Sequence, residues 1–418
     1  MKTIINPQKS TWSKILQRPT KTVDDIEKTV TEIFTEVKKD EDKAVQKYTQ
    51  LFDGVALGNN LVSEAEIEEA VSLVSDELKE AIILANKNIT VFHNAQKTDK
   101  VFVETTKGVE CWQEKRPIQK VGLYIPGGTA PLFSTVLMLA IPAQIAGCKE
   151  IVLCSPPNKE GKIHPAILFT AKLCGVTKII KVGGIQAIAG LTFGTETIPQ
   201  VYKIFGPGNQ FVTVAKQLAT KFGVAIDMPA GPSELLVVAD DAADASFVAS
   251  DLLSQAEHGA DSQVILVSTS KKLIDEVEVE INKQKAIANS KSIFVETDEI
   301  ALDLINEYGP EHFIVCTNNN DYYVDNISNA GSVFIGNYTP ESAGDYASGT
   351  NHTLPTNGFT KAYSGVNLDS FLKSITFQKI SKEGIKTIGK SIEIMAAAEG
   401  LQAHKNAVTL RLKSLKNG

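Results

Sequence analysis

Cysteine is scarce in this chain of 418 residues. Its five cysteines are an odd number, and no two are spaced as Cys-x-x-Cys, which argues against a disulfide scaffold. Free or buried thiols fit a reducing compartment, so we expect the protein to be cytoplasmic. The N-terminal residues MKTIINPQKSTW lack the apolar core of a signal peptide, which favours the same location.

Long apolar runs and excess positive charge are also missing. The most apolar run, from Val136 to Gly147, is interrupted by Pro142 and is shorter than the roughly 18 residues that a membrane span needs. A formal net charge of -7 argues against nucleic acid as a partner, because phosphates need a clustered basic face. With 43% hydrophobic and 22% charged residues, the composition is that of a soluble globular protein of two or three domains.

The hydrophobic pattern changes along the chain. Up to about residue 118 the apolar spacing predicts mostly helices. From 120 to 234 and from 235 to 366, continuous apolar runs alternate with helical stretches, which is typical of parallel sheets covered on both faces. We therefore predict an α/β fold with two doubly wound, Rossmann-like parallel-sheet domains and helical N-terminal and C-terminal extensions. The expected parts are a helical arm over 1–23, an α/β domain from 24–119 with 235–366, a second α/β domain over 120–234, and a helical tail over 367–418.

Three turns rich in glycine follow predicted strands between 120 and 234. They are YIPGG, which begins at Tyr124, GGIQ, which ends at Gln186, and GPGN, which ends at Asn209. At this rim of a parallel sheet, helix N-termini offer N–H groups to phosphates. No GxGxxG is present, so ordinary strand-to-helix turns remain an alternative to a dinucleotide site.

The segment Gly384–Ser391 matches the phosphate-binding P-loop pattern letter for letter. A P-loop needs an apolar strand directly before its first glycine and a helix that begins only at the lysine. Here the isoleucine spacing predicts a helix that is already under way at Gly384. We therefore interpret the match as structural.

A polar stretch, GNYTPESAGDYASGTNHTLP over 336–355, contains four groups that can do chemistry. Its low apolar content predicts a long ordered loop, and loops on rigid scaffolds often carry functional sites. A solvated surface loop is the alternative. The four groups are Glu341, Asp345, Tyr346 and His352.

Two sets of residues suggest a metal and a proton-transfer site. Gln255 and His258 project from one face of a predicted helix, and Asp345 with His404 would complete an N₂O₂ set suited to Zn²⁺. Spacing alone does not connect residues so far apart, so scattered polar residues remain an alternative.

The pair Glu311 and His312 opens the predicted strand HFIVCT, where both side chains can reach one cleft. A carboxylate beside an imidazole offers two bases of different strength, useful where a proton leaves and a water is later activated. An exposed pair is the alternative.

Seven longer motifs point to one family. YIPGGTAPLFSTVLM, GPGNQFV, MPAGPSE, SQAEHG, GPEH, SAGDYASGTNHTLP and AAAEGLQAHKNAV, in this order over nearly the whole chain, closely resemble histidinol dehydrogenase. The resemblance implies an NAD-dependent homodimer with one zinc ion per subunit. It implies oxidation of L-histidinol through L-histidinal to L-histidine, the last steps of histidine biosynthesis.

The resemblance also implies roles for particular residues. His312 is the general base, and Glu311 activates water, with two NAD consumed per substrate. The implied zinc ligands are Gln255, His258, Asp345 and His404, with the last histidine supplied to the partner subunit's site. The implied substrate contacts are Ser233, Gln255, His258, His312, Asp345, Tyr346, His352, Glu399 and His404. The implied NAD contacts are Tyr124, Gln186 and Asn209.

The same resemblance assigns the expected domains. It gives NAD to 120–234, most of the metal and catalytic residues to 24–119 with 235–366, and completion of the partner's site to 367–418.

Three other functions are the alternatives. A related zinc and NAD dehydrogenase that acts on another alcohol, such as a sulfonated diol, should lack the groups that read histidinol, here Ser233, Glu399 and His404. A P-loop nucleotidase would depend on the match at Gly384. A zinc hydrolase with Glu311 as its base would turn over without NAD.

Overall fold

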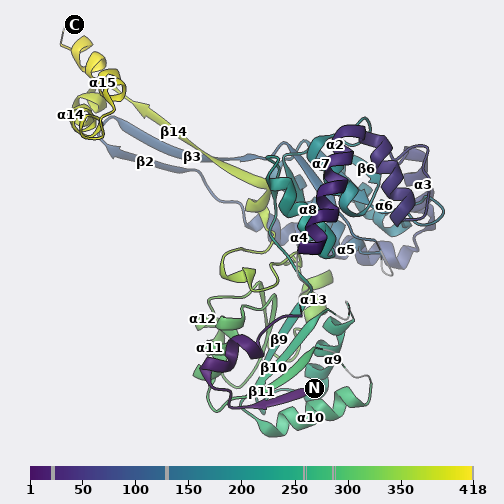
Figure 1. Ribbon diagram of the computed structural model, residues 1–418. Coiled ribbons are helices and arrows are strands. Elements are labelled where there is room, and N and C mark those ends of the chain that lie inside the picture. The colour runs from purple at the N-terminus through teal and green to yellow at the C-terminus, as the bar shows by residue number, and fades with distance from the viewer. Residues whose placement is uncertain are drawn as a thin grey trace. The chain divides into compact units, whose positions relative to one another are not determined.

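The computed structural model of the chain describes residues 1–19, 24–127, 131–257, 259, 261–284, 287 and 289–416. They form two compact units, Met1–Gln96 with Ile118–Phe371, and Lys97–Pro117 with Leu372–Gly418. The first unit holds two parallel sheets with helices on both faces of each (Figure 1), so the predicted fold class is confirmed. Within the described residues, no helix is both long and apolar enough to cross a membrane, and all five cysteines are free.

The five-stranded sheet has the order β6-β5-β4-β7-β8 and is parallel throughout. In chain order this is 3-2-1-4-5, so the winding direction reverses between β4 and β7. Ligands of open α/β sheets bind at the carboxyl ends of the strands beside such a reversal. The strands are β4 (Lys120–Tyr124), β5 (Glu150–Ser155), β6 (Lys178–Lys181), β7 (Lys203–Phe205) and β8 (Ala225–Ile226).

Helices cover both faces of this sheet. One apolar core joins α3, α4, α5 and α6 to the sheet, and the other joins α2, α7 and α8. Because both faces are covered, the strands are continuous apolar runs rather than alternating ones. The helices are α2 (Asp24–Phe52), α3 (Glu64–Leu73), α4 (Asp76–Ala95), α5 (Phe133–Ala146), α6 (Pro165–Leu173), α7 (Gly184–Phe193) and α8 (Gln210–Thr220).

The packing of α2 to α4 corrects the expected grouping of 24–119 with 235–366. Val30 and Phe34 of α2 share a core with Ile188 of α7, and Ile89 of α4 shares the other core with Leu123 of β4. These helices therefore belong to the five-stranded sheet. Their amphipathic spacing predicts an apolar face but does not specify which sheet it covers.

The six-stranded sheet is also parallel, with the order β1-β11-β10-β9-β12-β13. Without β1 the order is again 3-2-1-4-5, and the winding reverses between β9 and β12. The strands are β1 (Lys2–Ile5), β9 (Glu234–Ala239), β10 (Gln263–Ser268), β11 (Ser290–Phe294), β12 (His312–Cys316) and β13 (Ser332–Ile335).

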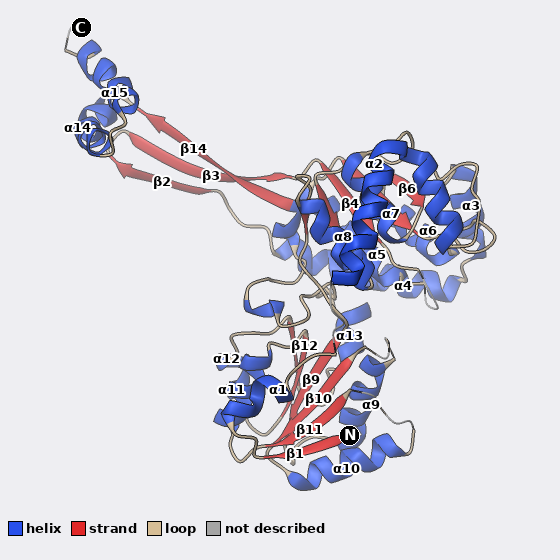
Figure 2. Ribbon diagram, viewed as in Figure 1, coloured by secondary structure: helices blue, strands red, loops and turns tan. Residues whose placement is uncertain are grey.

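Helices α1, α11 and α12 lie on one face of the six-stranded sheet and α9 and α10 on the other (Figure 2). The helices are α1 (Trp12–Ile15), α9 (Ala245–Ala256), α10 (Lys271–Asn282), α11 (Asp298–Tyr308), α12 (Asn320–Asn326) and α13 (Glu341–Tyr346). Short 3₁₀ turns are η1 (Lys9–Thr11), η2 (Phe359–Lys361) and η3 (Leu368–Phe371).

The expected helical arm over 1–23 is wrong for its first residues. They form β1, which pairs with β11 in the register Ile4↔Ile293, and only η1 and α1 are helical. A four-residue strand carries too little pattern to be read from sequence, and its pairing with a distant strand decides its conformation. Residues 20–23 of the expected arm lie outside the described residues.

The second unit contains an antiparallel sheet with the order β14-β3-β2 and two helices. The sequence predicted helices up to 118 and over 367–418, so these three strands are corrections. Five of the six residues of β2 are exposed, and the strand therefore lacks the alternation that would reveal it. The elements are β2 (Val101–Thr106), β3 (Val109–Pro117), β14 (Leu372–Ile380), α14 (Lys382–Ala398) and α15 (Gln402–Ser414).

The P-loop match at Gly384 is structural, as predicted. Helix α14 begins at Lys382, and the Ser381 side chain accepts a hydrogen bond from the Gly384 N–H at 3.0 Å. A Cβ atom at Gly384 would lie 2.2 Å from the carbonyl oxygen of Gly108. The glycine therefore allows the helix to pack closely on the β2–β3 turn.

Candidate active site

Glu311 and His312 lie at the amino-terminal edge of the six-stranded sheet, and both are buried. His312 is the first residue of β12, as predicted. Its Nδ1 lies 3.2 Å from the carbonyl oxygen of Glu234, the first residue of β9. Because a carbonyl oxygen can only accept, Nδ1 of the neutral ring carries the proton and Nε2 keeps its lone pair.

The neighbouring Glu311 is held by the same residue. Its Oε2 accepts a hydrogen bond from the Glu234 N–H at 2.8 Å and lies 3.6 Å from Nδ1 of His312. Burial raises the pKa of Glu311, because a charged carboxylate is poorly solvated there. Glu311 is therefore a stronger base than an exposed glutamate.

Two carboxylates of α13 complete this cluster. Glu341 Oε1 lies 3.6 Å from Nδ1 of His312, and Asp345 Oδ1 lies 3.6 Å from Nε2. Burial raises the pKa of Glu341 to about 8. Among the described residues, His312, Glu341 and Asp345 form a group whose ligand atoms all lie within 4.8 Å of one another, as a metal site requires.

The charge of this cluster favours a cation. Burial lowers the pKa of His312. The nearby carboxylates of Glu311, Asp345 and Glu341 raise it by more than burial lowers it, so the pKa lies well above its ordinary value. His312 Nε2 is buried and makes no hydrogen bond to any described residue. A metal ion on the carboxylates would offset their charge and leave the imidazole neutral enough to act as a base.

Gln255 joins the cluster from the last turn of α9, where it is fully buried. Hydrogen bonding favours the orientation in which its amide nitrogen donates to Glu341 and its oxygen accepts from the Glu234 N–H at 3.1 Å. The amide oxygen has a second lone pair with which it can bind a metal. Gln255 lies on the buried face of α9, together with Val248 and Leu252.

The donor set fits zinc as far as the structure describes it. Gln255 contacts Glu341, and Asp345 lies 3.6 Å from Nε2 of His312. Oxygen and nitrogen donors of this kind suit Zn²⁺. His258 lies outside the described residues. Glu399, at the end of α14, and His404, on α15, belong to the second unit.

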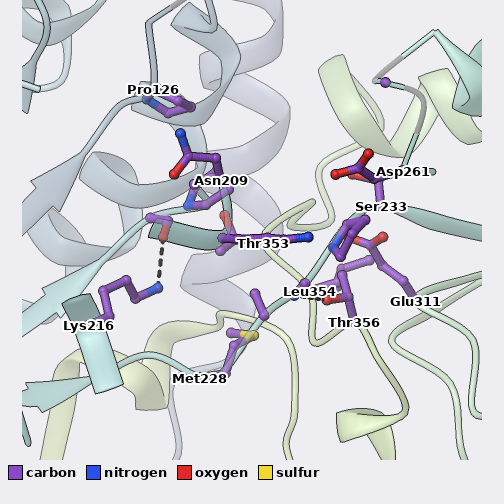
Figure 3. Close-up of a pocket in the computed structure, with 18 of the residues that line it drawn as sticks. Pro126, Asn209, Lys216, Met228, Ser233, Asp261, Glu311, Thr353, Leu354 and Thr356 are labelled. Atoms are coloured by element: carbon purple, nitrogen blue, oxygen red, sulfur yellow. Dashed lines mark hydrogen bonds between the residues drawn. The ribbon is translucent and has the colours of Figure 1, made fainter. Parts of the chain in front are cut away.

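A cavity of about 540 Å³ opens beside Glu311 (Figure 3). Asn209 lines one side, and Ser233 lies near Glu311 on the other. His352 also lines the cavity, with Nε2 3.2 Å from Thr135 Oγ1 and Nδ1 2.9 Å from the carbonyl oxygen of Asp345. Two of the expected substrate contacts, Ser233 and His352, therefore share a cavity with Glu311.

Tyr346, another expected substrate contact, ends α13 and is 54% exposed. No described contact directs its ring into that cavity, so its role stays a prediction.

A larger cavity, about 1160 Å³, lies at the carboxyl edge of the five-stranded sheet. Tyr124, which ends β4, and Asn209, which precedes α8, both line it and flank the winding reversal. The Tyr124 hydroxyl accepts a hydrogen bond from the Gly184 N–H at 3.1 Å, and burial raises its pKa to about 12. Asn209 Oδ1 caps α8 by accepting from the Val212 N–H at 3.1 Å, so its side-chain nitrogen is the group left for a ligand. The size and position suit a dinucleotide.

Gln186 differs from the other two expected NAD contacts. It is fully buried in α7 and is not among the residues that line the cavity. Neither its amide nitrogen nor its oxygen makes a hydrogen bond to a described residue, and such buried groups usually have a partner. Gly128, the last residue of the YIPGG motif, lies outside the described residues.

Sequence reasoning gave no role to Glu341 or Glu234. Glu341 had been noted only as a chemically capable group of the polar stretch, and Glu234 only as the last letter of MPAGPSE. Glu234 opens the apolar run ELLVVA, but this position alone does not reveal its burial, because Glu150 opens the similar run EIVLCS and is only partly buried.

Comparison with known proteins gives a consistent result over the whole chain. The family model for histidinol dehydrogenase matches residues 16–412. The histidinol dehydrogenases of Bacteroides thetaiotaomicron and Bacteroides fragilis are each 58% identical over 427 residues, with 100% of both chains covered. The crystal structure of histidinol dehydrogenase from Elizabethkingia anophelis matches with a TM-score of 0.97 and 55% identity, covering 100% of this chain and 99% of that one. The chain therefore belongs to the histidinol dehydrogenase family of oxidoreductases.

Proposed function

We propose that the chain oxidises L-histidinol through L-histidinal to L-histidine, a four-electron reaction that consumes two NAD and depends on one zinc ion. Family membership supports the reaction. The observation that connects it to this site is the buried pair Glu311 and His312, hydrogen-bonded to one residue and surrounded by the carboxylates of α13. The proposed location is the cytoplasm, where histidine biosynthesis would supply the substrate.

Gln255, His258, Asp345 and His404 would hold the zinc ion. Bound zinc would supply a Lewis acid that holds and orients the imidazole and amine of the substrate without changing its own oxidation state. The concentration of negative charge around Asp345 supports a cation there. If His404 comes from the partner subunit, each site of the homodimer needs the other chain.

His312 is the proposed general base of both oxidations. The carbonyl oxygen of Glu234 faces Nδ1, which leaves Nε2 to take the hydroxyl proton of the alcohol. NAD, when bound, would supply the acceptor for the hydride that the same carbon loses.

Glu311 is the proposed base for hydration of the aldehyde. The Glu234 N–H fixes one carboxylate oxygen, and the other can take a proton from water as the water oxygen attacks the aldehyde carbon. Return of this proton to the aldehyde oxygen gives the neutral hydrate. His312 would take a hydroxyl proton of the hydrate as it does from the alcohol, and a second NAD, when bound, would supply the hydride acceptor. Burial of Glu311 strengthens it as a base in this step.

Of the remaining expected contacts, Ser233 and His352 line the smaller cavity, and Tyr124 and Asn209 line the larger one. Ser233, Tyr346, His352 and Glu399 are proposed to bind the substrate, and Tyr124, Gln186 and Asn209 to bind NAD. Pro126, Asn209 and Phe211 line both cavities. Substrate and NAD bound in them would be neighbours, as hydride transfer requires.

The number of NADH molecules formed per L-histidinol consumed tests this proposal. Two per substrate, lost with a chelator and restored by zinc, is the expected result. One per substrate would mean that the reaction stops at the aldehyde and would contradict the role of Glu311. If no NADH is formed, L-histidinol is not the substrate, and other alcohols such as sulfonated diols become the candidates.

A further inference from the structure

Arg18 lies in the N-terminal segment just after α1, and its guanidinium group binds the carboxylate of Glu234 with two hydrogen bonds. Nη2 donates to Oε2 at 2.9 Å, and Nε donates to Oε1. The two side chains are only 15% and 3% exposed. Two parallel hydrogen bonds between planar groups fix the orientation of both, which a single contact would not do.

The guanidinium group is itself held on its other sides. Nη2 also donates to the carbonyl oxygens of Tyr308 and Gly309, at 2.9 and 3.3 Å, and the guanidinium carbon lies 4.0 Å from the centre of the Tyr308 ring. Arg18 therefore has one defined position, set by the end of α11. A lysine could not reproduce it, because an ammonium group has neither the plane nor the fork.

Glu234, which Arg18 holds in place, contacts both Glu311 and His312. Its N–H donates to Glu311 and its carbonyl oxygen faces Nδ1 of His312, so both side chains are oriented by the main chain of one residue. Pairing of β9 with β12 begins only at Leu235, opposite His312. On the β10 side, Glu234 is in register with Gln263, and the Gln263 N–H donates to the Ser233 carbonyl oxygen at 3.2 Å. The anchored side chain therefore adds to a sheet ladder that holds only one edge of β9 at this residue.

The other contacts of the carboxylate agree with this role. Oε1 also accepts a hydrogen bond from the Asn357 N–H at 2.7 Å. A buried ion pair contributes little net stability compared with apolar side chains of the same size. A purely structural role would therefore not require this set of hydrogen bonds.

We propose that Arg18 is a positioning residue for the reaction, which acts through Glu234 to hold Glu311 and His312 in their working orientation. The inference rests on the catalytic roles proposed above for those two residues. It makes the N-terminal segment part of the active site, although none of its described residues, 1–19, lines the substrate cavity.

The test compares Arg18→Lys with Lys9→Ala in the full-length protein. Lys9 pairs with Asp303 at 3.1 Å and connects the same segment to α11 without touching Glu234. Arg18→Lys is expected to lower kcat for both histidinol and histidinal about 10- to 100-fold, while KM for histidinol and NAD changes less than about twofold. Lys9→Ala is expected to keep the kcat of the wild type.

A second variant protects the test against misfolding. The double change Arg18→Gln, Glu234→Gln removes both charges and leaves no buried carboxylate unpaired. It should fold and still be slow, because glutamine side chains cannot form the same fork. In both variants, ¹⁵N chemical shifts of labelled histidine, assigned with His312→Asn, should show that His312 no longer has a single Nδ1–H tautomer.

Two results would overturn the inference. One is a kcat per folded molecule within about twofold of the wild type in both Arg18 variants. The other is a reduced kcat with the His312 tautomer unchanged. Failure of the underlying catalytic roles would look different, because Glu311→Gln and His312→Asn would then keep wild-type activity.

Discussion

The ammonium group of Lys216 lies 2.5 Å from the carboxylate of Asp227, and both side chains are almost completely buried. Lys216 also donates to the carbonyl oxygen of Gly206 at 2.7 Å, and Asp227 accepts from the Gly206 N–H at 2.8 Å. The pair therefore fastens the turn that leads to Asn209 to the segment that leads to β9. Both side chains line the smaller cavity.

Lys216→Met is expected to destabilise the protein by about 3–5 kcal/mol, because Asp227 would keep an unpaired buried charge. Urea unfolding measures the loss. The double change with Asp227→Asn should recover much of it, since Asp227 then carries no charge that Lys216 would have to compensate. An equal loss in the single and double variants would contradict this explanation.

His312→Asn should abolish the oxidation of both histidinol and histidinal. Asparagine can keep a hydrogen bond to the Glu234 carbonyl oxygen, but it cannot accept the hydroxyl proton. Steady-state assays that start from each substrate check this. Residual histidinal oxidation close to the wild-type rate would mean that another group is the base of the second oxidation.

Glu311→Gln should mainly slow the oxidation of the aldehyde. The amide keeps the shape of the side chain and can still accept from the Glu234 N–H, but it cannot take a proton from water. An activity loss of about 10²–10⁴-fold is expected with histidinal, and a smaller loss in the formation of the first NADH. Equal losses in both assays would contradict the proposed division of roles between Glu311 and His312.

Asp53 predicts a pH-dependent effect on stability. It follows α2 and lines the larger cavity, and burial raises its pKa from 3.8 to about 6. The folded protein thus binds this proton more tightly than the unfolded chain, so the stabilisation is full below pH 3.8 and is lost as pH rises through about 6.

Asp53→Asn should therefore be more stable than the wild type at pH 8, by about 1 kcal/mol after allowance for partial exposure. The difference should shrink towards zero at pH 4. Melting temperatures across this range provide the measurement. A difference that stays constant with pH would show that charge on Asp53 is not its cause.

Much of the fold could be predicted because burial on two faces leaves a strong pattern. The continuous apolar strand that ends at Tyr124 and the apolar stripe that includes Gln255 both follow directly from this. The antiparallel strands β2, β3 and β14 leave no such pattern, because most of their residues are exposed or only partly buried. Their pairing depends on partners far along the chain, such as Trp112 with Phe377.

The residues of the candidate site could be predicted where they are neighbours in the sequence. Contacts between residues far apart in the sequence could not be predicted. Glu311 and His312 are adjacent in sequence, so their joint role could be expected. The contact of Arg18 with Glu234 joins residues 216 positions apart, and no local spacing indicates it. Tertiary contacts between single charged residues have no periodicity to read.

The strand β1 has a consequence for how the chain is made. Its partner residues in β11 come 289 positions later in the sequence, and Glu296, which contacts Asn6, comes 290 positions after Asn6. At roughly 5–20 residues per second, the N-terminal segment waits about 15–60 s before its partners leave the ribosome. The five-stranded sheet and its helices can fold in that time. The part of the chain that is synthesised first is therefore among the last to find its place.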